Sequence, residues 1–156
     1  MRRSLIATMA TALWLGSASA HELEVGPFRI THPWTPASPA GATAAPLYMS
    51  ITLTGESADR LIGASSPVAD RVEFHRHTRA GEAVTTDVLP WLVLTANSAA
   101  VLKPDGLCLV LIGLHAPLQE FDSFPLTLRF EKADSITVEV TVEEPGAAEP
   151  REDYGL

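Results

Sequence analysis

Two runs near the end of the chain alternate apolar and polar residues, at 127–130 (TLRF) and at 136–142 (ITVEVTV). This alternation places every second side chain on one face, which is typical of half-buried antiparallel strands. The intervening residues 132–135 (KADS) are turn-forming, so the pair indicates a β-hairpin. After residue 20, no long stretch has the i, i+3, i+4, i+7 apolar spacing of an amphipathic helix. The sequence therefore predicts an all-β chain.

Further short runs rich in β-forming residues are separated by Pro, Gly, Asp and Asn. We expect strands near 23–30, 45–54, 60–65, 71–77, 84–89, 101–103, 107–114, 125–131 and 135–143. Many short strands with regular turns favour an antiparallel sandwich or barrel. The segment 33–46 contains four prolines, and we expect it to form an extended loop over one end of the sandwich.

The first twenty residues have the layout of a secretory signal peptide. Arg2 and Arg3 precede a short apolar run at 5–15, and Ala18-Ser19-Ala20 supplies the small residues of a cleavage site. A permanent single-pass anchor is the alternative, although the apolar run is short for a membrane span. We expect Sec export and no stable membrane insertion after cleavage. The expected organisation is a signal peptide at 1–20, one domain at 21–144 and a disordered tail at 145–156.

The charge of the chain limits its partners. The 156 residues include 11 basic and 19 acidic residues, and loss of Arg2 and Arg3 would leave a net charge near −10. Nucleic acids and anionic lipids need basic patches, so neither is expected as a partner. No nucleophile elbow, zinc-protease motif or phosphate loop is present, and we expect no enzymatic activity.

Three side chains suggest a soft metal site. His75 and His77 stand at i and i+2 of an expected strand, so both point to one face. The only cysteine, Cys108, lies in a second strand-like run and cannot form an internal disulfide. Thiolate with imidazole suits Cu(I), Cu(II) or Zn(II). Alternatively, Cys108 is a buried small apolar residue and the histidines are solvated. Cleavage after Ala20 would give His21 a free α-amine beside its imidazole. His21 would then be either a Cu(II) chelator or a frayed terminus.

Several motifs resemble the periplasmic copper chaperone family PCu(A)C, over about residues 30–142. They are His32-Pro-Trp34, APLYMSIT at 45–52, DRLIGASSPV at 59–68, VEFH at 72–75, KPDG at 103–106, LIGL at 111–114 and PLTLRFE at 125–131. The resemblance implies a cupredoxin-like β-sandwich without a blue-copper centre. It also implies that Cu(I) is held in an exposed His/Met site and passed between periplasmic proteins, notably toward the copper sites of cytochrome oxidase.

The family's ligand pattern of His, Met, His and Met falls here on His75, Thr86, Cys108 and Val110. One ligand is thus retained, one is exchanged for a thiol, and both thioethers are missing. Two hypotheses follow. In the first, the protein is a copper chaperone that binds Cu(I) through His75, Cys108 and His77. In the second, it is a metal-free interaction or scaffold protein that keeps the fold and buries Cys108.

Overall fold

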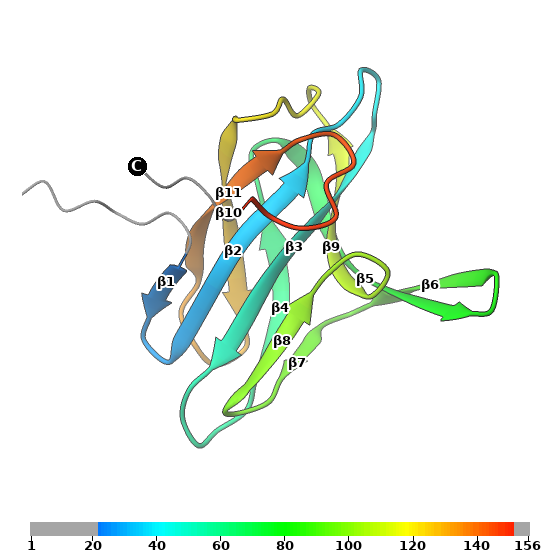
Figure 1. The fold of residues 1–156 in the computed structure, drawn as a ribbon. Helices are drawn as coiled ribbons and strands as arrows, with labels where there is room; N and C mark the ends of the chain where they lie inside the picture. The colour runs from blue at the N-terminus through cyan, green and yellow to red at the C-terminus, as the bar shows by residue number, and fades with distance from the viewer. Residues whose placement is uncertain (1–21, 152–156) are drawn as a thin grey trace, which may run out of the picture.

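The structure, a computed structural model, describes residues 22–151, and these residues form strands and loops without any helix (Figure 1). The all-β prediction is confirmed. The strands are β1 (Glu22–Val25), β2 (Phe28–Pro36), β3 (Ala44–Leu53), β4 (Asp59–Ser65), β5 (Ala69–Ala80), β6 (Ala83–Leu89), β7 (Leu92–Leu94), β8 (Ser98–Leu102), β9 (Leu107–Leu114), β10 (Ser123–Phe130) and β11 (Ile136–Glu143).

The strands pair in the order β6-β5-β9-β3-β2-β11-β10-β4-β7, with β1 on β2 and β8 on β3. Strand β3 joins the two layers, because its residues 44–47 pair with β9 and its residues 49–52 pair with β8. Such a strand makes a corner of a sandwich. Every paired strand is antiparallel to its neighbour except β11, which runs parallel to β2. The architecture is the expected cupredoxin-like β-sandwich.

One apolar cluster fills the space between the layers. Its fully buried members include Leu47 and Ile51 of β3, Leu109 and Leu111 of β9, and Leu126 of β10. Within β3 and β9 these core residues are separated by an even number of positions, as the pleat requires. The residues that alternate with them therefore belong to the opposite face, and in β9 these include Cys108 and Val110.

Two expectations about the first strands are wrong in detail. The expected strand at 23–30 is two strands, because Gly26 turns the chain with a φ of 56°. The expected loop at 33–46 is shorter, because β2 continues to Pro36. His32 has a φ of 49°, and the register with β3 shifts between Thr31 and Trp34. This bulge lets Pro33 occupy a strand without breaking the ladder.

The predicted signal peptide at 1–20 lies outside the described residues and stays a prediction. Within residues 22–151, no helix has the length and apolarity that a membrane crossing would require. Of the expected tail, residues 145–151 are described: Ala147 lies against buried side chains and Arg151 forms ion pairs. The rest of the tail, 152–156, lies outside the described residues.

Candidate functional site

His75 and Cys108 occupy directly opposite positions on neighbouring strands. In the antiparallel pairing of β5 with β9, His75 stands across from Cys108, and Phe74 stands across from Leu109. Phe74 and Leu109 are core residues, so the adjacent pair points to the outer face of the sheet. Opposite residues of an antiparallel pair have Cβ atoms about 4.5–5.5 Å apart. The fold thus brings together two of the three residues that the sequence suggested.

Cys108 is buried on this outer face and is a member of a small cluster with Trp34 and Tyr48. The two aromatic rings lie 4.8 Å apart between centroids. Burial raises the pKa of the Cys108 thiol to about 11, because the thiolate loses its hydration in an apolar setting. The thiol is therefore protonated at neutral pH. A soft metal ion would have to displace this proton to bind sulfur.

His75 is held by a carboxylate that sequence reasoning missed. The imidazole is 15% exposed, and its Nε2 lies 2.9 Å from Oε2 of Glu73. The hydrogen bond from His75 and a second one from Arg71 lower the pKa of Glu73. Because a carboxylate accepts, Nε2 carries the proton, and in the neutral ring the free lone pair is on Nδ1. The sequence did contain a signal for this contact, because Glu73 is two residues before His75 and side chains at this spacing share one face of a strand.

His77 lies farther along the same face. Its ring centroid is 6.4 Å from that of His75, and its Nδ1 is 2.8 Å from the hydroxyl of Thr86 on β6. Among residues 22–151, no three His, Cys, Asp or Glu side chains are grouped so that they could hold a metal ion. The structure therefore brings His75 next to Cys108 and leaves His77 engaged with Thr86.

The four positions of the family pattern nevertheless share one face. Thr86 stands opposite His77, and Val110 stands opposite Glu73. Met49 is not available as a substitute thioether, since it is buried in the main core. His21 lies outside the described residues.

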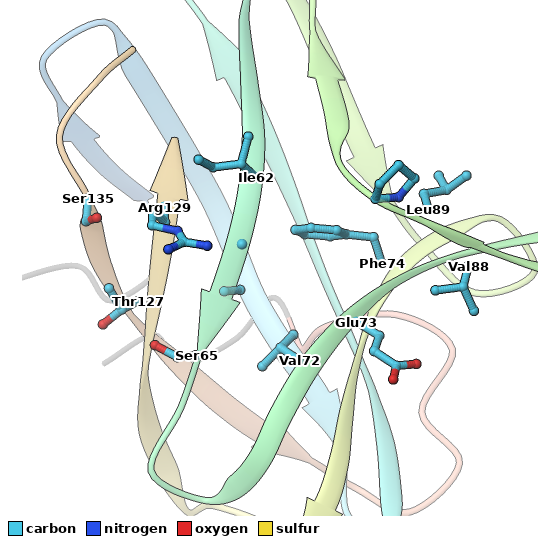
Figure 2. A pocket seen from close by; sticks show the side chains of 13 residues that line it. Ile62, Ser65, Val72, Glu73, Phe74, Val88, Leu89, Thr127, Arg129 and Ser135 are labelled. Atoms are coloured by element: carbon cyan, nitrogen blue, oxygen red, sulfur yellow. The ribbon is translucent and has the colours of Figure 1, made fainter. Parts of the chain in front are cut away.

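A hollow of about 490 Å³ lies beside the site, between β4 and the β5–β6 hairpin. Figure 2 shows Phe74 directed toward β4 from one side and Arg129 toward β4 from the other. Its lining includes Gly63 and Glu73. No described histidine lines this hollow, and neither does Cys108. It borders the candidate metal ligands through Glu73 and through Val88, which stands opposite His75.

Comparison with known proteins shows the family of the chain. Residues 28–142 match the model of the LpqE-like family. A relative from Leifsonia xyli subsp. xyli, Lxx21020, is named as a lipoprotein and is 28% identical over 153 residues, which is 91% of each chain.

Solved structures are similar over most of the chain. The copper-bound PCuAC domain from PmoF2 is 32% identical with a TM-score of 0.70, over 80% of this chain and 99% of that one. The Cu(I) form of DR1885 from Deinococcus radiodurans is 26% identical with a TM-score of 0.62, over 81% and 83%. The fold, the shared face of the four pattern positions and these similarities lead to one conclusion: the chain belongs to the LpqE-like family and is a PCuAC domain protein.

Proposed function

We propose that this protein is a periplasmic copper chaperone that binds Cu(I) through His75 and Cys108, with His77 as a third ligand. One observation carries the proposal. His75 and Cys108 are register partners on the outer face of β5 and β9, and they occupy the two histidine positions of the family pattern. The copper-bound PmoF2 domain and Cu(I)-DR1885 support copper as the cargo, since both are similar structures that hold it.

The ligand chemistry favours the reduced ion. A thiolate is a soft donor that selects Cu(I), and a neutral imidazole is a good companion ligand. Glu73 fixes His75 with Nδ1 free, as second-sphere carboxylates do for metal-binding histidines. His77 joins by giving up its contact with the Thr86 hydroxyl, which is an exposed hydrogen bond. Because the Cys108 proton must leave, copper affinity increases with pH below the thiol pKa.

The proposed partner is a periplasmic protein that donates or accepts copper, with the copper sites of cytochrome oxidase as the eventual destination. Transfer requires that a second set of ligands approach the metal. The β5–β6 hairpin offers that approach, because Val88, opposite His75, and Val84, farther along the hairpin, are 62% and 50% exposed. The name of the Leifsonia relative supports an envelope location.

An anaerobic Cu(I) titration against a chromophoric chelator tests the site. We expect one-to-one binding that weakens by about tenfold or more in Cys108→Ser and in His75→Ala, with a smaller effect in His77→Ala. His115→Ala is the matched control, because His115 is an exposed histidine held by Asp70 away from this face. If no variant binds differently from the parent protein, or if the parent does not compete, the proposed site is wrong.

A second candidate function is a metal-free interaction or scaffold protein. The burial of Cys108 with Trp34 and Tyr48 favours it, since the thiol then acts as a small apolar core residue. The two hypotheses differ in what Cys108→Ala does. A scaffold keeps its partner binding in this variant, whereas a copper chaperone loses copper transfer.

A further inference from the structure

The chain beyond β11 returns over the candidate site. The segment 144–151, here called the strap, follows β11 and lies beyond the family match, which ends at residue 142. In Figure 1 it is the red end of the coloured ribbon, which loops back from β11 across β2 and β3. A turn begins it, closed by the hydrogen bond from Ala147 N to Glu144 O of 3.2 Å, with Gly146 at a φ of 76°.

The middle of the strap covers the cluster that contains the thiol. Ala147 is partly buried and packs against the cluster of Trp34, Tyr48 and Cys108. The next three residues, 148–150, form one side of a 360 Å³ hollow whose other side includes Trp34. Cys108 is 1% exposed. The thiol is thus buried in a cluster with two aromatic rings, and Val110 and Ala147 of the strap pack against that cluster.

The end of the strap is fastened by one arginine. Arg151 Nη2 lies 3.0 Å from Oε1 of Glu120, and Arg151 Nε lies 4.0 Å from Oε2 of Glu143. The guanidinium also lies over the Phe121 ring, 5.2 Å from its centroid. Glu143 is buried, so Arg151 compensates a carboxylate that water does not reach. The Arg151 and Glu120 side chains are each 32% exposed.

Through these contacts the strap is attached less firmly than the strands that surround Cys108. Partly exposed ion pairs contribute little to stability, and the strap belongs to no strand ladder. Segments with few buried contacts open locally without global unfolding. The strands β5 and β9, by contrast, are joined along seven paired positions.

We propose that the strap is a cover that controls access to Cys108, so that reagents and metal reach the thiol when Arg151 releases and Ala147 lifts. The strap would thus control access to one of the copper ligands that the proposed function requires, and this part rests on that function. Its test is independent of copper, since thiol accessibility is measured without metal.

The experiment measures the rate at which a thiol reagent, 5,5′-dithiobis(2-nitrobenzoate), modifies Cys108 in the folded protein. The full chain is compared with a chain that stops after Glu144 and with one that stops after Arg151. We expect removal of the strap to accelerate modification by at least about tenfold, and the later stop to leave the rate unchanged. Arg151→Ala keeps every strap residue except the fastening side chain, and we expect an intermediate acceleration.

Circular dichroism melting of each variant separates opening from unfolding. Unchanged modification in the folded strap-less chain and in Arg151→Ala would overturn the proposal, because the sandwich itself would then enclose the thiol. If the strap-less chain does not fold, Arg151→Ala decides alone. Faster modification together with no copper binding would support the strap as a cover and reject the proposed copper site. Copper binding through Cys108 together with an unchanged modification rate would support the copper site and reject the cover.

Discussion

The Cys108 thiol links folding to alkaline pH. Its pKa is raised by burial from 9.0 to about 11 in the folded protein. Between these values the unfolded chain loses the thiol proton while the folded chain keeps it, so the free energy of unfolding falls as pH increases, by up to about 3 kcal/mol. Cys108→Ala should lack this fall. Urea unfolding of both proteins at about pH 8 and about pH 10.5 measures the difference, and parallel pH profiles would contradict the prediction.

A side chain at Gly113 in β9 would be unfavourable for two reasons, its backbone conformation and a clash with Asp70. Its φ is 72°, and a Cβ there would lie 2.7 Å from Cγ of Asp70. We expect Gly113→Ala to reduce the free energy of unfolding by about 2–3 kcal/mol. Gly81 has a φ of 65° with open space around it, so Gly81→Ala should cost only about 1 kcal/mol. Equal losses in chemical denaturation would show that Asp70 simply moves aside.

Among the connections between elements, Asp59 at the start of β4 stands out. Its buried carboxylate accepts hydrogen bonds from the backbone N–H groups of Arg60, Lys132 and Ala133, at 2.7, 3.1 and 3.1 Å. It thereby fastens β4 to the β10–β11 turn. We expect Asp59→Ala to destabilise the protein by about 2–3 kcal/mol, since two distant donors lose their acceptor.

The control for Asp59 is in the same turn. Asp134 is exposed, so Asp134→Ala should change the melting temperature little. A small effect of Asp59→Ala in the same melting experiment would mean that water replaces the carboxylate. The backbone of the β10–β11 turn would then be satisfied without β4.

Most strands were predictable, because the alternation of apolar and polar residues and the positions of turn residues depend on local geometry. Strand β9 matches its expected bounds at 107–114, and β11 differs from its expected start by one residue. Strand β7 was missed, because three residues after a proline carry no periodic signal. The extension of β2 through Pro33 was also missed, since it depends on a bulge at His32 that pairing with β3 creates.

The candidate site was predictable only in part. The sequence identified His75, His77 and Cys108, but the pairing of His75 with Cys108 is a property of strand order, which no local pattern contains. The cover over Cys108 depends equally on distant segments, because Trp34, Tyr48 and Ala147 come from three separate parts of the chain. Burial of the thiol was therefore one of two open alternatives until the fold was known.

At the scale of the whole molecule, one apolar cluster joins both layers. It includes Ile30 of β2, Leu61 of β4 and Leu111 of β9. Because no layer has a core of its own, we expect a single cooperative unfolding transition. Tryptophan fluorescence, to which the buried Trp34 and the 45% exposed Trp91 contribute, should coincide with far-ultraviolet circular dichroism in urea. Two separated transitions would show that the layers are independently stable.

The pleat of β9 also determines how such a protein can change over generations. Leu109 and Leu111 hold the strand in the core, while Cys108 and Val110 lie on the other face. A substitution at 108 or 110 alters the donor atoms offered to a metal without removing a core side chain. An insertion or deletion of one residue would exchange the two faces and place polar groups in the interior. A new set of metal ligands can thus arise by single-residue substitution, and the fold is retained when the bound metal changes.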